Sequence, residues 1–183
     1  ALDAFAKYSQ AFPNEPKIQD YILSILLSSE RYDEALTRLR ARSAQNPGDK
    51  ANNLAIATVL IRAGSLDEAL AYVKSLGARA DSMAHYTVGV ACFEKVRNDK
   101  EQLISPEQRM VIVDAGIEEL RKSVAMTPDS FDSLVYLNLV LRQKARLEVD
   151  PVVQQALIAE AVTLQDKARA IAAARKAKEA AAS

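Results

Sequence analysis

The sequence has few of the residues that build most catalytic and metal sites. Its 183 residues include one cysteine, Cys92, and one histidine, His85. A single cysteine excludes an internal disulfide and a cysteine-based metal cage. A single histidine argues against His-rich metal sites and most catalytic triads. We therefore expect no metal and no cofactor, and we expect that the protein is not an enzyme.

Net charge and long apolar runs are also missing. The 24 Lys and Arg balance the 24 Asp and Glu, which argues against a nucleic-acid partner because binding to phosphates needs an excess of cations. No apolar run approaches the ~20 residues that span a bilayer, so no transmembrane segment is predicted. The 49% apolar and 26% charged content is typical of a globular chain and excludes wholesale disorder.

Glycine and proline are scarce, and some of the prolines and turn segments recur at a fixed spacing. The sequence numbers of Pro13 and Pro47 differ by 34, and the segments 31–36 (RYDEAL) and 65–70 (SLDEAL) align at the same offset. A fixed offset of this size indicates a repeat architecture. No alternating β pattern competes with the helical spacing of apolar residues.

A third step of the repeat is longer. Pro128 follows Pro47 at an offset of 81, which is 34 plus 47, and Gly116 follows Ala69 at an offset of 47. Both markers therefore indicate a unit of the same period with the same insertion of 13. The spacing predicts nine helices, over 1–11, 16–29, 32–45, 50–63, 66–79, 82–97, 107–126, 130–147 and 151–178. The first of them falls inside a unit, so it is either a shortened cap or the second helix of a unit whose first helix precedes it.

With this register, the chain resembles the tetratricopeptide repeat proteins. The family has small residues at positions 8 and 20 of each unit, as in Ala57 with Ala69 and in Gly89 with Gly116. Its pattern is broken at position 8 by Leu23 and by Asn138, and Asp81 replaces a final proline. The long third and fourth units resemble bacterial members.

The resemblance implies an all-α fold, a right-handed superhelical solenoid of helix-turn-helix repeats. It implies one array over 1–183, with repeats at 16–49, 50–81, 82–130 and 131–183. The segment 1–12 would be the helix of an incomplete first repeat.

The resemblance also implies which side chains line a concave groove that takes a partner. These residues are Asp20, Ser24, Leu27, Leu54, Thr58, Ile61, Arg62, Tyr86, Val90, Phe93, Leu139 and Arg142. Asp20 and Ser24 stand where chaperone-tail binders have Lys and Asn, so capture of an acidic C-terminal tail is not expected. The alternative is that the last helices fold back and fill the groove.

Two functions remain open from the sequence. The first is a non-enzymatic scaffold or adaptor that binds another protein or peptide in the groove. The second is an accessory subunit permanently docked on a larger, membrane-associated complex through its convex face or the loops 98–106 and 147–151. The resemblance favours a periplasmic or membrane-associated location over the cytoplasm, and the absence of an initiator Met is compatible with a removed targeting segment.

The residues that invite a catalytic interpretation have structural explanations. His85 and Cys92 occupy core positions about two helical turns apart, ~10 Å along the axis, which is too far for a hydrogen-bonded pair. Adjacent acids such as Glu118 and Glu119 point to different faces of a helix. The basic segment 165–183 is interpreted as a solvated capping helix, or as an arm that contacts an acidic partner or anionic lipid.

Overall fold

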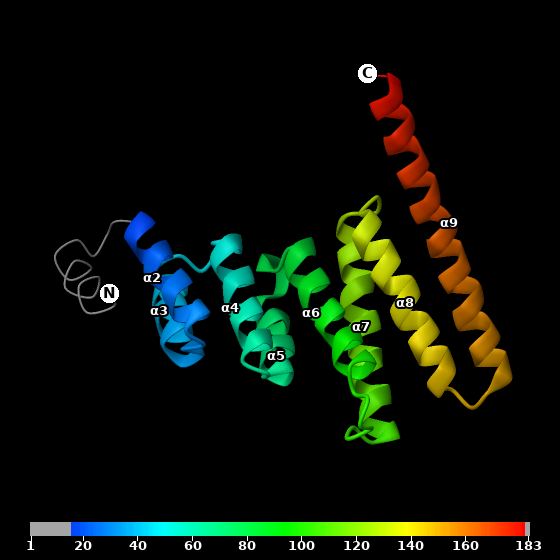
Figure 1. Ribbon diagram of the computed structural model, residues 1–183, viewed down its shortest axis with the longest axis horizontal. Helices are drawn as coiled ribbons and strands as arrows, with labels where there is room; N and C mark the ends of the chain where they lie inside the picture. Colours follow the sequence, from blue (N-terminus) through cyan, green and yellow to red (C-terminus); the bar gives the residue numbers. More distant parts are fainter. Residues whose placement is uncertain (1–15, 182–183) are drawn as a thin grey trace. The chain divides into compact units, whose positions relative to one another are not determined.

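The computed structural model describes residues 16–181, with side chains from Gln19 onward, and this range contains helices and turns but no β-strand. The elements are α2 (Pro16–Ser28), α3 (Tyr32–Gln45), α4 (Lys50–Arg62), α5 (Leu66–Leu76), the short 3-10 helix η1 (Gly77–Arg79), α6 (Ser82–Arg97), α7 (Pro106–Met126), α8 (Phe131–Leu147) and α9 (Pro151–Ala181) (Figure 1). The helix expected over 1–11, and the incomplete repeat 1–12 that would contain it, lie outside the described residues.

The described helices begin and end close to the expected positions, but one of them changes from an α-helix to a 3-10 helix near its end. The helix expected over 66–79 ends at Leu76 and continues as η1. Gly77 has a φ of 54°, and this left-handed conformation ends the α-helix. The glycine was visible in the sequence, but a single glycine does not tell whether a helix continues through it.

Short polar residues cap the N-termini of several described helices. Asp49 accepts a hydrogen bond from the Asn52 N–H (3.0 Å) at the start of α4, and Asp81 does the same for the Ala84 N–H (2.9 Å) at the start of α6. Ser105 and Gln108 form a reciprocal capping box at the start of α7. These caps satisfy backbone donors that have no partner within the helix.

The chain divides into two compact units, residues 1–72 and 73–183, and the boundary lies within α5. In the first unit, α3 packs against both α2 and α4. Its buried apolar side chains include Ile22, Leu26, Leu36, Leu39, Ile56 and Leu60.

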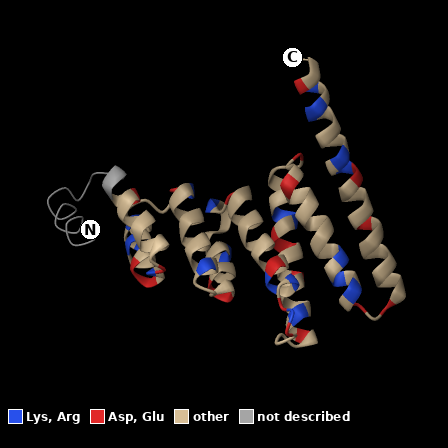
Figure 2. Cartoon of the chain, in the orientation of Figure 1, with Lys and Arg blue, Asp and Glu red and all other residues tan. Residues whose placement is uncertain are grey.

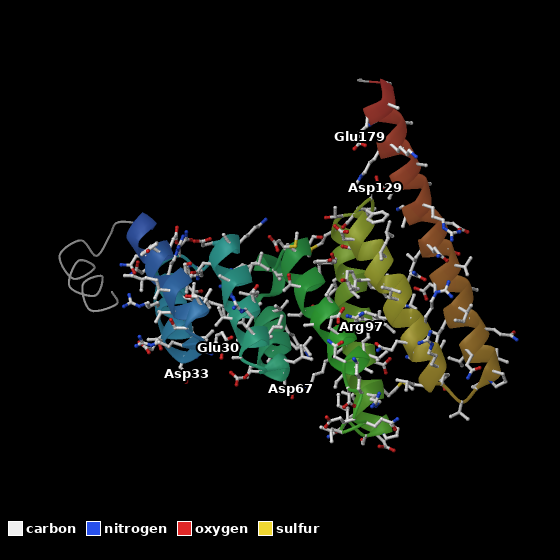
Figure 3. All side chains as sticks on the ribbon, in the orientation of Figure 1. Glu30, Asp33, Asp67, Arg97, Asp129 and Glu179 are labelled. Carbon is white, nitrogen blue, oxygen red and sulfur yellow. The ribbon has the colours of Figure 1, made fainter. Side chains whose placement is uncertain are left out.

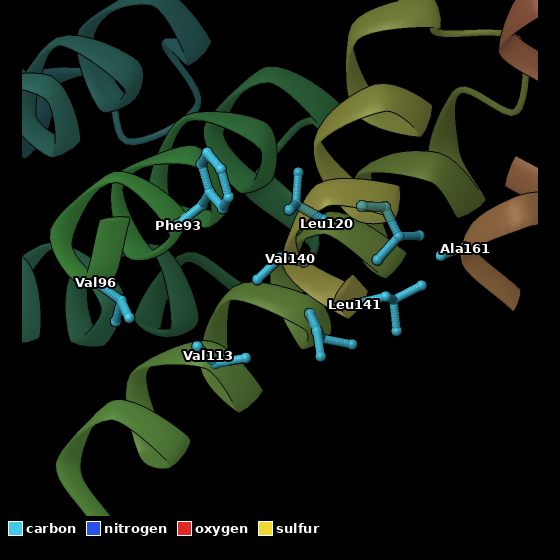
Figure 4. Packing of buried hydrophobic residues seen from close by; sticks show 9 residues of the cluster. Phe93, Val96, Val113, Leu120, Val140, Leu141 and Ala161 are labelled. Carbon is cyan, nitrogen blue, oxygen red and sulfur yellow. The ribbon is translucent and has the colours of Figure 1, made fainter. Parts of the chain in front are cut away.

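In the second unit, α7 packs between α6 and α8, α9 packs along α8, and α6 also contacts α8. One hydrophobic cluster joins all four helices (Figure 4). Its buried members are Phe93, Val96, Val113, Ile117, Leu120, Leu137, Val140, Leu141 and Ala161.

Two glycines allow α6 and α7 to approach closely. A Cβ atom on Gly89 would lie 2.6 Å from Leu120 Cγ and 3.2 Å from the Gly116 carbonyl oxygen. A Cβ atom on Gly116 would lie 2.9 Å from Cys92 Cβ. The small residues at positions 8 and 20 of the third repeat therefore set the distance between its two helices, as the repeat register predicted.

Candidate protein-interaction site

The predicted groove residues fall into two sets, one in each unit. In the first unit, Asp20 is exposed and forms an ion pair with Arg42 of α3 (3.3 Å), while the guanidinium of Arg62 lies 5.9 Å from the centre of the Tyr32 ring. Ser24 and Arg62 are exposed, and four residues keep part of their surface accessible: Leu27, Leu54, Thr58 and Ile61. The Thr58 hydroxyl donates to the Leu54 carbonyl oxygen of its own helix (2.9 Å).

In the second unit, α6 and α8 bring aromatic side chains together. The Tyr86 and Tyr136 rings meet edge to face at 5.7 Å, and Phe93 meets Tyr136 in the same way at 5.9 Å. Such edge-to-face pairs are favourable beyond the area they bury. Val90 and Leu139 are half-buried and pack against the same cluster as Tyr86 and Tyr136. Four of the predicted residues therefore share one patch, which we call the α6/α8 face: Tyr86, Val90, Phe93 and Leu139, with Tyr136 added.

Tyr136 and Arg97 were not predicted as part of this face. The repeat register did not place Tyr136 among the groove residues. The Arg97 guanidinium lies 5.7 Å from the centre of the Phe93 ring, a cation–π distance, and Figure 3 marks this residue near the end of α6. Both contacts join residues by tertiary packing, which the sequence pattern does not specify.

Phe93 and Arg142 differ from the other members because the protein itself already covers them. Phe93 is 9% exposed and belongs to the hydrophobic core. Arg142 is half-buried and donates to Asn138 (2.8 Å) and to Gln165 of α9 (3.2 Å). The Arg142 side chain is therefore already engaged by α9.

The surroundings of Tyr86 keep its hydroxyl protonated. Burial raises the pKa of Tyr86 above its ordinary value, and the negative charge of Asp132 and the neighbouring Tyr136 raise it further. At neutral pH this hydroxyl is therefore available as a hydrogen-bond donor at the edge of an apolar patch.

His85 is buried, as its position in the repeat predicted, but its partner was not foreseen. His85 Nδ1 lies 2.6 Å from Glu119 Oε2, and the other oxygen of Glu119 accepts from Lys122 Nζ (2.7 Å). Glu119 is buried whereas Glu118 is exposed, so adjacent acids do point to different faces. Because the buried carboxylate has partners on both oxygens, a structural role accounts for this group.

A shallow depression on α7 holds mainly paired charges. It is lined by Asp114, Ile117, Glu118, Arg121, Lys122, Ala125 and Lys144. Lys144 pairs with Asp114 (2.6 Å) and Lys122 with Glu118 (2.7 Å). Arg121 pairs with Glu160 of α9 (2.8 Å). These pairs neutralise one another, and the depression gives no basis for a catalytic assignment.

The described residues, 16–181, contain neither a candidate metal site nor a candidate membrane span. They contain no group of three or more His, Cys, Asp or Glu side chains arranged to hold a metal ion. Among these same residues, no helix combines the length and the apolar character that crossing a membrane requires.

The helical hairpins and the close glycine contact define a protein built from helix-turn-helix repeats. Residues 26–86 match the family model of the Tetratricopeptide repeat. No curated protein sequence matches the chain significantly.

Solved structures show the same fold. The chain superposes on MamA, residue 41 to the end, from Desulfovibrio magneticus RS-1 with a TM-score of 0.57 and 17% identity, covering 92% of this chain and 84% of that chain. For a double mutant of MamA RS-1 the TM-score is 0.56, with 18% identity over 90% of this chain and 83% of that chain. The chain therefore has an all-α, tetratricopeptide-like solenoid fold, and the family match over residues 26–86 agrees with the resemblance noted in the sequence. This fold is typically a non-catalytic scaffold for protein interactions.

Proposed function

We propose that the chain is a non-enzymatic scaffold that binds a segment of another protein on the α6/α8 face. The observation that most supports this is the shared patch of half-buried apolar side chains, Tyr86, Val90, Tyr136 and Leu139, packed on one core. An apolar centre with charged residues around it is the arrangement of interface hot spots. Asp132 and Arg97 supply those charges here.

The remaining predicted residues have different roles in this proposal. Phe93 lies in the core and contacts the Tyr136 ring edge to face. Arg142 links α8 to α9 through its hydrogen bond to Gln165. The predicted groove residues of the first unit are proposed as a separate contact set: Asp20, Ser24, Leu27, Leu54, Thr58, Ile61 and Arg62. The partner is a protein or peptide rather than nucleic acid, because the chain has no net positive charge.

Substitutions on the α6/α8 face test this function. In a quantitative pull-down from an extract of the source cells, the native chain should recover its partner proteins. We expect the triple variant Tyr86→Ser, Val90→Ser, Leu139→Ser to recover none of them. Circular dichroism would establish that the variant keeps its helices. Phe93 is left unchanged because it is a core residue and its loss would unfold the unit.

A second surface provides both the control and the alternative function. Leu103 is 79% exposed and Val149 is 90% exposed, each in one of the two lengthened loops. The variant Leu103→Ser, Val149→Ser should recover the same partners as the native chain. If this variant loses them and the α6/α8 variant retains them, the proposed site is wrong.

That second outcome would favour an accessory subunit docked through its loops. The α6–α7 loop has an ordered conformation in which Asp99 accepts hydrogen bonds from the N–H groups of Leu103 (2.9 Å) and Ile104 (3.0 Å). Arg109 of α7 also pairs with Asp99. An apolar side chain held outward by such a loop suits permanent docking. In that case the chain would co-migrate with a large assembly in size-exclusion chromatography of the native extract.

A further inference from the structure

The α6/α8 face carries opposite charges at its two ends. On α8, Asp132, Leu139 and Arg146 follow one another at intervals of seven residues, which places them along one side of the helix. Asp132 and Arg146 are exposed, and Leu139 is half-buried. The apolar part of the face on α8 therefore lies between an acid near the start of the helix and a cation near its end, ~21 Å apart along the axis.

Helix α6 adds a second cation at the same end as Arg146. The Ser123 hydroxyl of α7 lies 2.9 Å from the Ser82 carbonyl oxygen and 2.9 Å from the Ser133 hydroxyl, so α6 and α8 begin at the same end of the unit. The two helices have similar lengths of 16 and 17 residues, and Arg97 is the last residue of α6. Arg97 and Arg146 therefore lie toward the other end of the face. Figure 2 shows the basic side chains of α8 in the half toward its C-terminus.

The chain itself does not neutralise either end of the face. Asp132 and Arg146 form no ion pair with any side chain of residues 19–181. Arg97 pairs with Glu94 (2.7 Å), but its side chain remains 58% exposed. Arg142 donates to two uncharged side-chain amides, which leave its positive charge uncompensated. Three guanidinium groups and one carboxylate therefore give the basic end a net positive charge, while Asp132 leaves the other end negative.

We propose that the α6/α8 face binds a protein segment with an apolar middle, acidic side chains at the end over Arg97 and Arg146, and a cation at the end over Asp132. This inference rests on the proposed function and adds to it the charge pattern and the orientation of the partner. Guanidinium groups bind carboxylates through paired, charge-assisted hydrogen bonds. Complementary charges at both ends favour one orientation of the segment and disfavour the reverse.

Selection from a random peptide library tests this charge pattern. The probes are peptides of ~14 residues, a length that as a helix spans the ~21 Å between Asp132 and Arg146. Each peptide is fused to a phage coat protein through its C-terminus, so that only side-chain carboxylates are available. The native full chain should enrich peptides in which acids stand on one side of an apolar stretch and a Lys or Arg on the other side.

A charge-reversed variant tests where the preference for acids arises. Arg97→Glu, Arg146→Glu should bind a selected peptide about tenfold more weakly in fluorescence anisotropy, because two attractions become repulsions. Circular dichroism would establish that this variant keeps its helices. Lys176→Glu, Lys178→Glu is the matched control, since it changes the net charge equally at exposed residues of α9 outside the face. This control should bind the peptide as the native chain does.

The triple variant Tyr86→Ser, Val90→Ser, Leu139→Ser separates this inference from the proposed function. If the triple variant loses the selected peptide while the charge-reversed variant retains it, the charge pattern is wrong and the α6/α8 face remains the binding site. If the triple variant retains the peptide, the face itself is wrong. Equal weakening by the α9 control, or a selection on the native chain that enriches no acid-ended peptide, would also overturn the inference.

Discussion

Glu30 and Gly64 occupy equivalent positions, one repeat apart, in the turns that follow α2 and α4. Both have a left-handed backbone, with φ of 56° for Glu30 and 83° for Gly64. In each turn the next residue donates to a carbonyl oxygen five positions back, Arg31 to Leu26 and Ser65 to Leu60, both at 2.9 Å. This is the geometry that ends many helices, and it favours glycine at the left-handed position. Figure 3 marks Glu30 in its turn.

The first prediction follows from this pair of turns. Glu30→Gly should raise the free energy of unfolding by about 0.5–1 kcal/mol, because it removes the unfavourable contact of Cβ with the backbone in a left-handed residue. Urea denaturation followed by circular dichroism measures the change. Gly64→Ala is the reciprocal control and should lower stability by about 1 kcal/mol, since space around Gly64 is open and only the backbone strain acts.

At the scale of elements, the α6–α7 hairpin depends on the absence of two side chains. Gly89→Ala should destabilise the protein by about 1–3 kcal/mol, because the added methyl group overlaps buried Leu120 and the Gly116 carbonyl oxygen. Thermal unfolding would measure the loss. Gly48→Ala is the control, since its Cβ would meet its nearest neighbour at an ordinary 3.7 Å, and it should leave the unfolding temperature within a few degrees. A Gly89→Ala protein as stable as the native chain would contradict the close contact.

The loop between α6 and α7 supports a third prediction. Burial alone would raise the pKa of Asp99, but the N–H donors of Ile104 and Leu103 and the charge of Arg109 lower it below its ordinary value of 3.8. The ionised form therefore stabilises the loop above pH 3.8, and this contribution is lost as the pH falls through the lowered pKa. Asp99→Asn should remove much of it at neutral pH.

Hydrogen exchange measures that change. The amides of Leu103 and Ile104 should exchange faster in Asp99→Asn, because an amide side chain is a weaker acceptor than a carboxylate. Amides in the middle of α8 should keep their native rates, which separates local loosening from global unfolding. Unchanged exchange at both loop amides would show that Asp99 does not order the loop.

At the scale of the whole molecule, the repeat register predicted most of the fold. Pro47, Asp49 and the paired acids Asp33 and Glu34 are local signals, because helix ends are determined by residues within one turn. The glycines at 89 and 116 were also informative, since a close helix contact needs small residues at fixed positions. These features recur at the repeat spacing, or at a consistent longer one. A single sequence therefore shows the same helix-turn-helix pattern several times.

The proposed α6/α8 face was less predictable, because its contacts join residues that are distant in sequence and do not follow the repeat. The repeat pattern did not identify Glu119, rather than Glu118, as the partner of His85, because this pairing depends on how α7 is rotated about its axis against α6. Tyr136 likewise joins the α6/α8 face only through the way α8 packs on α6.

Site-specific photo-cross-linking would show whether a partner protein binds on the α6/α8 face. The chain would carry a photoreactive phenylalanine analogue at Tyr86, or at exposed Val111 of α7 as the control, and would be irradiated in an extract of its source cells. Our account predicts a discrete covalent adduct with another protein at position 86 and none at position 111. An adduct at position 111 with none at position 86 would contradict partner binding on the α6/α8 face.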